Sequence, residues 1–404
     1  MRIIKYALLA AALSACSREA QVTQPSESRS QLGANTTYQV VKYPTLGGSL
    51  SRGMAINNHG VAAGWSMQAD GTRRAVLWQN SNSIMPLGTL GGPSSTVPWP
   101  GLNEQGMVVG ISHTGLVDPL DEDWACEFAG FLTEVTNLIC RGFVWQNNVM
   151  RELPPLGGYH SFAAGVNNQG QIVGWAETPV HDPTCDPTTK QVLQFRAALY
   201  ELKKGAISVR QLRPLPGDST SAATAINEAG QAVGISGPCD QAVGRYSAIH
   251  SVMWDKSGRV REIPHLGGVT WHTPMDINQR GDVAGFSNPA GVVPEDDFEP
   301  HAYLWIYGTA AAVDLQTLPG DLFSQAFAIN QDGQVVGVSF GGANGSHAFI
   351  YQNGQMTDLN NILGTGNGDI FRSAQDINDA GQITGRVFDA ATGKTVPFVA
   401  TPLP

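Results

Sequence analysis

Charged residues are scarce in this 404-residue chain, at 14 % of the total, and the basic ones are the fewest. Only 24 Lys and Arg stand against 34 Asp and Glu, which gives a formal net charge of −10. Nucleic-acid phosphates are bound by clustered Lys and Arg, so this composition argues against a nucleic-acid partner. Because 42 % of the residues are hydrophobic, the composition also argues against a wholly disordered chain.

Metal-binding and phosphate-binding motifs are also missing. The chain has no His-x-x-x-His pair, no Cys-x-x-Cys pair, no Asp-x-Asp-x-Asp-Gly loop and no phosphate-cradling glycine loop. We therefore expect no cofactor. Ca²⁺ is the one ion that the sequence leaves open, because acidic residues gather in the predicted loops, although a solvated rim is the simpler interpretation. These residues are Asp118, Asp121, Glu122, Asp123, Glu127, Asp182, Asp186, Glu295, Asp296, Asp297 and Glu299.

The first residues read as an export signal. A short basic segment, Met1 to Lys5, precedes a short apolar stretch, Tyr6 to Ala15. Leu13-Ser-Ala-Cys16 resembles the lipobox of bacterial lipoproteins, which implies acylation of Cys16, removal of residues 1–15 and anchoring in a membrane, with the outer membrane expected. Residues 16–37 are rich in Ser, Gln and Thr, and we expect them to form a flexible tether.

One phrase recurs seven times in the remaining residues, 38–404. An aliphatic residue precedes an Asn, a Gly follows the Asn at the third position, and a second Gly lies four residues further on. The mean spacing of about 53 residues indicates a repeat fold. The seven Asn are Asn57, Asn103, Asn167, Asn227, Asn278, Asn330 and Asn378.

The phrase predicts a tight turn between two strands. Asn at the first turn position bonds nearby backbone, Gly at the fourth accepts a positive φ, and the second Gly marks a bulge or a close backbone approach. Two further elements keep the same period: an aromatic-ended strand such as His347-Ala-Phe-Ile-Tyr351, and a Leu-x-x-Leu-Gly-Gly or Leu-Pro-Gly-Asp phrase. Each period therefore contains four short strands.

Four strands per roughly 50 residues is typical of a β-propeller blade. The last period lacks its fourth strand, and Tyr38 to Gly48 supplies an extra copy of it. We therefore predict an all-β fold, a seven-bladed β-propeller of four-stranded blades, closed by an N-terminal strand that completes the C-terminal blade.

These combined phrases resemble those of bacterial extracellular HAF-repeat proteins, over roughly Tyr38 to the C-terminus. The resemblance implies export and a repeat fold, and it brings no assigned reaction. At the start of the third strand, Arg74, Arg141 and Arg196 stand where His250, His301 and His347 stand in later copies, and Val396 stands in the last. Equivalent positions lie in different blades, so we expect one local hydrogen bond each rather than a metal centre.

Nearly all insertions fall between the second and third strands, and four cysteines lie in them. Cys126 and Cys140 share one insertion, whereas Cys185 and Cys239 lie in insertions of successive blades. Export favours disulfides, and this placement favours Cys126–Cys140 and Cys185–Cys239 over the two other pairings.

The face that carries the insertions also carries the starts of the innermost strands. We predict that nine residues there surround the mouth of a central channel and bind a sugar ring or an aromatic side chain, although several could instead pack under the loops. They are Arg52, Trp99, His160, Phe162, Trp271, His272, Phe323, Phe371 and Arg372.

We therefore expect a lipid-anchored, extracytoplasmic and monomeric binding module whose glycan or protein partner the sequence does not name. One alternative is a glycan hydrolase or lyase at the channel mouth, for which Asp218, Asp276, Asp321 and Asp376 are the carboxylates to test. Another is a scaffold subunit of an outer-membrane complex that uses the sides of the blades.

Overall fold

The computed structural model describes residues 36–122, 131–132, 136–185, 190–203, 205–240, 245–293, 297–364 and 366–403. All belong to the Leu32–Pro404 unit of the chain. No helix in these ranges is long and apolar enough to cross a membrane. The predicted acylation site Cys16, the predicted signal segment 1–15 and most of the predicted tether 16–37 lie outside them.

The described residues form antiparallel four-stranded sheets that follow one another along the chain. Five are separate sheets in which strand order equals chain order. They are β6(Gly91–Thr96)–β7(Val108–Val117)–β8(Leu138–Gln146)–β9(Val149–Glu152), β10(Ser161–Val166)–β11(Gln171–His181)–β12(Leu193–Lys203)–β13(Ala206–Leu212), β14(Thr220–Ile226)–β15(Ala232–Gly237)–β16(His250–Trp254)–β17(Val260–Glu262), β18(Thr273–Ile277)–β19(Val283–Ser287)–β20(His301–Trp305)–β21(Val313–Asp314) and β22(Phe323–Ile329)–β23(Val335–Gly342)–β24(Gly345–Gln352)–β25(Gln355–Asp358).

The remaining eight strands make two more four-stranded groups. The first is β2(Gly47–Ile56)–β3(Ala62–Gln68)–β4(Arg73–Asn80)–β5(Ser83–Pro86), and the second is β26(Ile370–Ile377)–β27(Ile383–Asp389)–β28(Lys394–Pro402) with β1(Tyr38–Lys42) paired to β28. One parallel bridge, Leu50 to Thr395, connects the two groups. A single short helix, α1(Leu359–Leu363), is found among the described residues.

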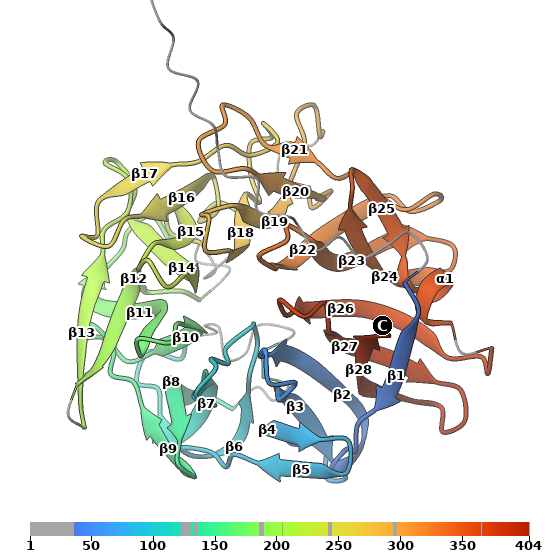
Figure 1. Ribbon diagram of the computed structural model, residues 1–404. Helices are drawn as coiled ribbons and strands as arrows, with labels where there is room; N and C mark the ends of the chain where they lie inside the picture. The colour runs from blue at the N-terminus through green and yellow to red at the C-terminus, as the bar shows by residue number, and fades with distance from the viewer. Residues whose placement is uncertain are drawn as a thin grey trace, which may run out of the picture. The chain divides into compact units, whose positions relative to one another are not determined.

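Figure 1 shows the sheets around a common centre, with first strands such as β14, β18, β22 and β26 innermost and fourth strands such as β13 and β17 outermost. Apolar side chains of neighbouring sheets pack between them. Val109 and Val144 of one sheet, for example, share a buried cluster with Ile172 and Tyr200 of the next. Each sheet thus buries its faces against its two neighbours.

The predicted turns are present between the first and second strands. In the turn at Asn330, the Gly333 backbone N–H donates to the Asn330 carbonyl at 3.1 Å, and Gly333 has a φ of +79°. The second glycine of each phrase lies where a strand approaches closely: a Cβ on Gly337 would overlap the Gln325 carbonyl oxygen. Inner-strand bulges occur opposite these glycines, as between Ala326 and Ala328. Both glycine predictions are confirmed.

The Asn side chains of the repeats do more than form turns. Asn330 Oδ1 accepts the backbone N–H groups of Asp332 (3.1 Å) and Gln334 (3.0 Å), while its Nδ2 donates to the Asn378 carbonyl (3.1 Å) in the next sheet. Every copy repeats this bond to the next copy, and Asn378 Nδ2 donates to the Asn57 carbonyl at 2.9 Å. The seven bonds therefore form a cycle, which we call the Asn ring.

A second cycle runs beside it through the residue that follows each Asn. The side chain of this residue accepts the backbone N–H of the same residue in the preceding copy. Gln331 Oε1, for instance, accepts from Gln279 at 3.1 Å. The other acceptors are Glu104, Asn168, Glu228, Gln279, Asp379 and Asn58. These bonds are exposed to solvent, whereas those of the Asn ring are buried.

Two carboxylates, the partly buried Asp276 and the buried Asp376, support the same end of the inner strands. Asp276 Oδ2 accepts the Ile329 N–H (2.9 Å), and Asp376 Oδ2 accepts the Ile56 N–H (2.7 Å), each from another sheet. Burial raises the pKa of Asp276 to about 6, and burial together with the charge of Asp276 raises the pKa of Asp376 well above its usual range. Their ionised forms are therefore disfavoured in the folded protein.

We expect Asn330→Ala to destabilise the fold far more than Gln331→Ala. The first change removes one of the two hydrogen bonds to the buried Asn378 carbonyl and leaves the N–H groups of Asp332 and Gln334 without their acceptor, at about 1–3 kcal/mol for each buried group. The second removes a solvent-exposed bond and should cost about 0.5 kcal/mol or less. Denaturant unfolding of the two variants measures the difference, and an Asn330→Ala protein as stable as Gln331→Ala would disprove a structural role for the Asn ring.

The two carboxylates should make the protein less stable as pH rises. Since the pKa of Asp276 is about 6 in the folded chain against an ordinary 3.8, the folded state holds a proton that the unfolded state has already lost near pH 5. The stability that this bound proton gives to the folded state is lost as pH rises through 6. Asp376 extends the loss of stability to higher pH. Asp276→Asn should therefore narrow the difference in melting temperature between pH 5 and pH 8. The control Asp255→Asn should leave it unchanged, because the pKa of Asp255 is about 2; an equal effect of both substitutions would contradict this reasoning.

Candidate functional site

The inner strands present alternate residues to the centre, and their starts form a cavity of about 520 Å³. We call it the mouth cavity. Arg52 and Met54 of β2, Thr273 and Met275 of β18, and Gln325 and Phe327 of β22 line it in this alternating way. Its other lining residues are Trp65, Pro98, Trp99, Phe131, Trp271, Phe286, Phe298 and Gln375. Seven of the 14 lining residues are aromatic.

One wall is a packed aromatic group. Phe162 stacks on Trp175 at 3.8 Å between ring centroids, and Trp99 contacts both rings at 5.3 and 5.5 Å. Phe131 lies edge-on to Trp99 and Phe162 at 5.3 and 5.2 Å. Trp99 and Phe131 therefore form the surface of this wall, and Phe162 lies behind them, fully buried.

A second wall contains Trp271, which packs edge-on against Phe298 at 4.7 Å. Phe298 also meets Phe286 at 6.0 Å and is 39 % exposed. Trp271 has a φ of +65°, a left-handed conformation that is costly for a bulky side chain, about 1–3 kcal/mol. Strained residues of this kind are concentrated at ligand sites.

The polar groups at the mouth cavity are cationic or neutral. Trp65 lies between two guanidinium groups, with Arg73 at 3.8 Å and Arg52 at 5.8 Å from its ring centre. Gln325, Gln375 and Thr273 add hydrogen-bonding groups, and no described lining residue is a carboxylate. Burial, and then the charges of Arg386 and Arg73, place the pKa of Arg52 well below its usual range.

Of the nine residues predicted at the mouth, the structure places Arg52, Trp99 and Trp271 in the cavity wall. The prediction was wrong in position for most of the others. Phe162 is covered by Trp99 and Phe131, and Phe371 is buried against Phe398 at 4.9 Å. Phe323 packs on Phe340 at 5.5 Å, and Arg372 donates to the Asn344 carbonyl at 3.0 Å.

The two predicted histidines are buried and bonded inside the protein. His272 Nδ1 contacts Ser287 Oγ (2.7 Å) and Nε2 contacts the Gly268 carbonyl (2.9 Å), and burial lowers its pKa to about 3. The Cys140 N–H donates to His160 Nδ1 at 3.1 Å. These contacts replace water around the two buried imidazoles, and neither ring lines the mouth cavity.

His160, Asp118 and Glu122 form a buried cluster whose side-chain ligand atoms lie within 4.8 Å of one another. His160 Nδ1 accepts the Cys140 N–H, and Nε2 lies 3.3 Å from Asp118 Oδ2. Both ring nitrogens therefore face groups of the protein. Glu122 Oε1 accepts the N–H groups of Val192 (2.6 Å) and Leu193 (2.8 Å). Burial and the Glu177 carboxylate raise the pKa of Glu122 to about 8.

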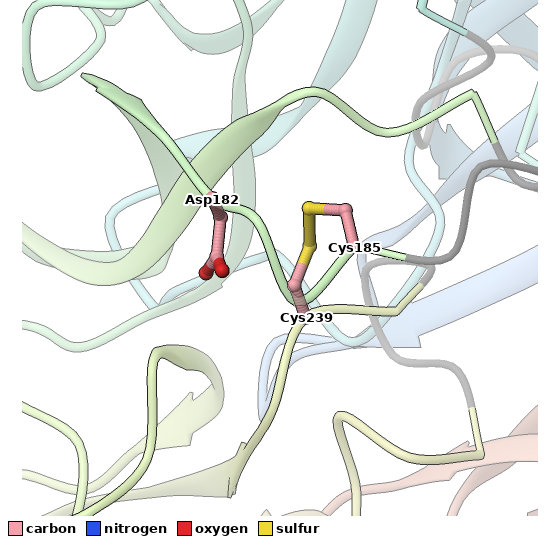
Figure 2. A group of neighbouring side chains, drawn as sticks. All are labelled: Asp182, Cys185 and Cys239. Carbon is pink, nitrogen blue, oxygen red and sulfur yellow. A yellow bond between two sulfur atoms is a disulfide. The ribbon is translucent and has the colours of Figure 1, made fainter.

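Asp182, Cys185 and Cys239 lie together between two insertions (Figure 2). The two sulfurs form a disulfide with a Cα–Cα distance of 4.5 Å, which confirms the predicted Cys185–Cys239 pair and leaves no thiolate for a metal. Asp182 Oδ1 instead accepts from the Thr184 N–H and hydroxyl at 3.0 and 2.6 Å. Cys126, the predicted partner of Cys140, lies outside the described residues, as do Asp123, Glu127, Asp186, Glu295 and Asp296.

The residues that start the third strands make local contacts, as expected. His250 meets Glu262 at 2.9 Å, His301 meets Asp314 at 3.0 Å and His347 meets Asp321 at 3.1 Å. Each carboxylate belongs to the same sheet as its histidine or to the loop before it. No ring of histidines converges on the mouth cavity.

The four carboxylates considered for catalysis do not meet at the mouth cavity. Asp276 and Asp376 line a separate polar cavity beside the Asn ring, at the far ends of the inner strands. Asp218 Oδ2 accepts the Ser236 hydroxyl at 2.5 Å, and Asp321 contacts His347. A Gly-x-Ser-x-Gly sequence, Gly337–Gly341, lies inside β23, and its Ser339 is fully buried. These four carboxylates and Ser339 therefore do not form one site.

Sequence reasoning missed the residues deeper along the inner strands. The residues three and five positions before each repeat Asn face the centre. Three positions before it, the lining residues are Met54, Met275, Phe327 and Gln375. Five positions before it, they are Thr273, Gln325 and the already predicted Arg52. The two-residue alternation of strands contains this signal. Trp65 and Phe286 share another repeat position, directly after the second glycine, whereas Phe131 and Phe298 come from the insertions, and no repeat position identifies those two.

A scan against protein-family models gives no match, and a search of curated protein sequences also gives none. Solved structures do match. The β-propeller domain of the Trilobed protease from Pyrococcus furiosus is 8 % identical and aligns with 88 % of this chain and 98 % of its own, with a TM-score of 0.48. The Pyrococcus horikoshii acylaminoacyl peptidase, also 8 % identical, aligns over 88 % of this chain with a TM-score of 0.50.

This chain spans about half (52 %) of the length of the Pyrococcus horikoshii acylaminoacyl peptidase. The Aleuria aurantia lectin, solved with Fucα1-6GlcNAc, is 9 % identical over 89 % of this chain and 98 % of its own, with a TM-score of 0.35. At such identities the likeness concerns the fold alone. It agrees with the sheet pattern: the chain has an all-β fold of repeated four-stranded sheets, in the β-propeller class.

Proposed function

We propose that the protein is a binding module whose mouth cavity takes a sugar ring, carried on a seven-bladed β-propeller in which β1 completes the last blade. The observation that carries the proposal is the aromatic mouth cavity of about 520 Å³, which is within the size range of ligand pockets. The seven bonds of the Asn ring and the pairing of β1 with β28 support the closed arrangement.

The chemistry of the wall favours a sugar. Sugar rings have an apolar face of C–H groups that packs on aromatic planes, and hydroxyls around the edge that need donors and acceptors. Trp271, Phe298 and Trp99 offer the planes, and the amides of Gln325 and Gln375 offer the hydrogen bonds. Binding rather than turnover is favoured because no described carboxylate lines the mouth cavity.

We also propose that the protein resembles HAF-repeat proteins in being exported, and that acylated Cys16 anchors it to the outer membrane through the 16–37 tether. The Cys185–Cys239 disulfide supports an oxidising compartment.

The binding proposal predicts that an oligosaccharide stabilises the full-length protein. Chitotetraose, cellotetraose and tetragalacturonate are suitable probes; one at about 100 times its Kd should add about 2.7 kcal/mol to the stability. Trp271→Ala should weaken the affinity about tenfold, because it removes an aromatic contact surface of the mouth cavity. Tyr307→Ala, an exposed aromatic outside the cavity, should leave it unchanged. Calorimetric titration gives the affinities, and equal affinities for both variants would place binding elsewhere.

The anchoring proposal predicts that Cys16→Ser moves the protein from the membrane fraction to the soluble fraction of the native cells. Acylation needs the thiol, and the described residues contain no membrane-spanning helix that could replace the anchor. Fractionation with immunodetection measures the distribution. A Cys16→Ser protein that stays with the membranes would contradict the lipid anchor.

A further inference from the structure

A second cavity of about 350 Å³ adjoins the mouth cavity and contains a second arginine. Arg52 of β2, Phe298, Gln325, Phe327 and Gln375 line both cavities, so the two cavities lie side by side. Arg386, from β27, lines the second one, where Ser346 and Ser373 also lie. The two cavities together have an aromatic part and a cationic part.

Arg52 and Arg386 have no counter-charge among the described residues. The Nε of each guanidinium is buried and has no hydrogen-bond partner, and neither group forms an ion pair within the described ranges. The charges that act on Arg52 are those of Arg386 and Arg73, and the charge that acts on Arg386 is that of Arg372; all of them are positive.

Three other arginines of this protein contact carboxylates. Arg259 contacts Asp255 at 3.1 Å, Arg280 contacts Asp282 at 2.9 Å and Arg141 contacts Glu152 at 3.4 Å. The chain has ten more acidic than basic residues, so unpaired cations are not a consequence of composition. A partly buried, unpaired guanidinium is costly, and a second one beside it adds repulsion.

An anion removes both costs. A carboxylate or a sulfate accepts paired N–H bonds from the planar guanidinium fork, and it neutralises the repulsion between the two arginines. Arg52 is placed to serve both parts of the site, since it lines both cavities and lies above Trp65. A ligand that reaches from the aromatic wall to Arg386 would therefore present its ring and its charge together.

We propose that the site takes an acidic sugar, carboxylated or sulfated, whose anionic group is bound by Arg52 and Arg386 while its ring lies on the aromatic wall of the mouth cavity. This inference rests on the proposed sugar-binding function and specifies the ligand class. A sugar is favoured over an acidic peptide because amides of Gln325 and Gln375 stand beside the aromatic planes, where ring hydroxyls would need them.

The test compares ligands that differ only in charge, by calorimetric titration of the full-length protein. Tetragalacturonate and its methyl ester share the same rings, and a sulfated galactose tetrasaccharide and its desulfated form make the second pair. We expect an acidic member to bind at least about tenfold more tightly than its neutral partner, and this preference to shrink as the salt concentration rises. The pair that shows the preference identifies the anion as carboxylate or sulfate.

Arg386→Gln should abolish the preference for the acidic sugar and leave the affinity for the neutral one unchanged. Arg259→Gln is the matched control, because it removes the same charge from an exposed ion pair and should change neither affinity. If Arg386→Gln does not fold, Arg52→Gln replaces it, and the salt dependence of the wild type still tests the role of charge.

Three results would overturn the inference, and they differ in whether the proposed sugar-binding function still stands. Equal affinities for acidic and neutral sugars, unchanged in Arg386→Gln, would remove the anion site and keep the sugar-binding function. Tighter binding of a Glu-rich peptide containing Trp than of any sugar would replace the ligand class. Binding of none of these probes would overturn the proposed function itself.

Discussion

The hydrogen bond from each repeat Asn to the next is the contact on which the rest of the structure depends. One amide performs two tasks: Oδ1 holds the turn of its own sheet, and Nδ2 binds the carbonyl of the neighbouring Asn. Because these groups are buried, an unmade bond would be costly, so each sheet fixes the position of the next. Hydroxyls near the start of the first strands act similarly, as when Ser324 Oγ accepts the Ala302 N–H of the preceding sheet at 2.8 Å.

This arrangement separates a rigid end of the inner strands from a variable one. At the Asn ring the residues are nearly identical in each copy, and even the departures, Asp276 and Asp376, bind backbone N–H groups of other sheets. Five residues before the Asn, roughly 17 Å of extended strand away along β2, the positions equivalent to Arg52 hold different residues in each copy. A binding site can vary there because the fold is specified elsewhere.

The mouth cavity shows how one side chain is kept accessible and another is buried. Phe162 and Arg52 stand at the same repeat position, five residues before the Asn, yet only Arg52 lines the cavity. Trp99 and Phe131 cover Phe162, whereas the neighbourhood of Arg52 contains further arginines and polar amides. The insertions thus decide which inner-strand residues reach a ligand, although the strands decide which residues point inward.

The sequence by itself determined the repeated unit. The turn at Asn57 and Gly60, the four short strands of each repeat and the pairing of Cys185 with Cys239 could be predicted, because the turn residues and the strand spacing recur in each copy. Only the tertiary structure decided the site. Trp65, Phe131, Phe298 and Arg386 come from second strands and insertions of different sheets, and His160 and His272 proved to be buried. Trp65 and Arg386 share one repeat position, after the second glycine, but which copies of that position reach the cavities depends on how whole sheets pack and how insertions fold over them.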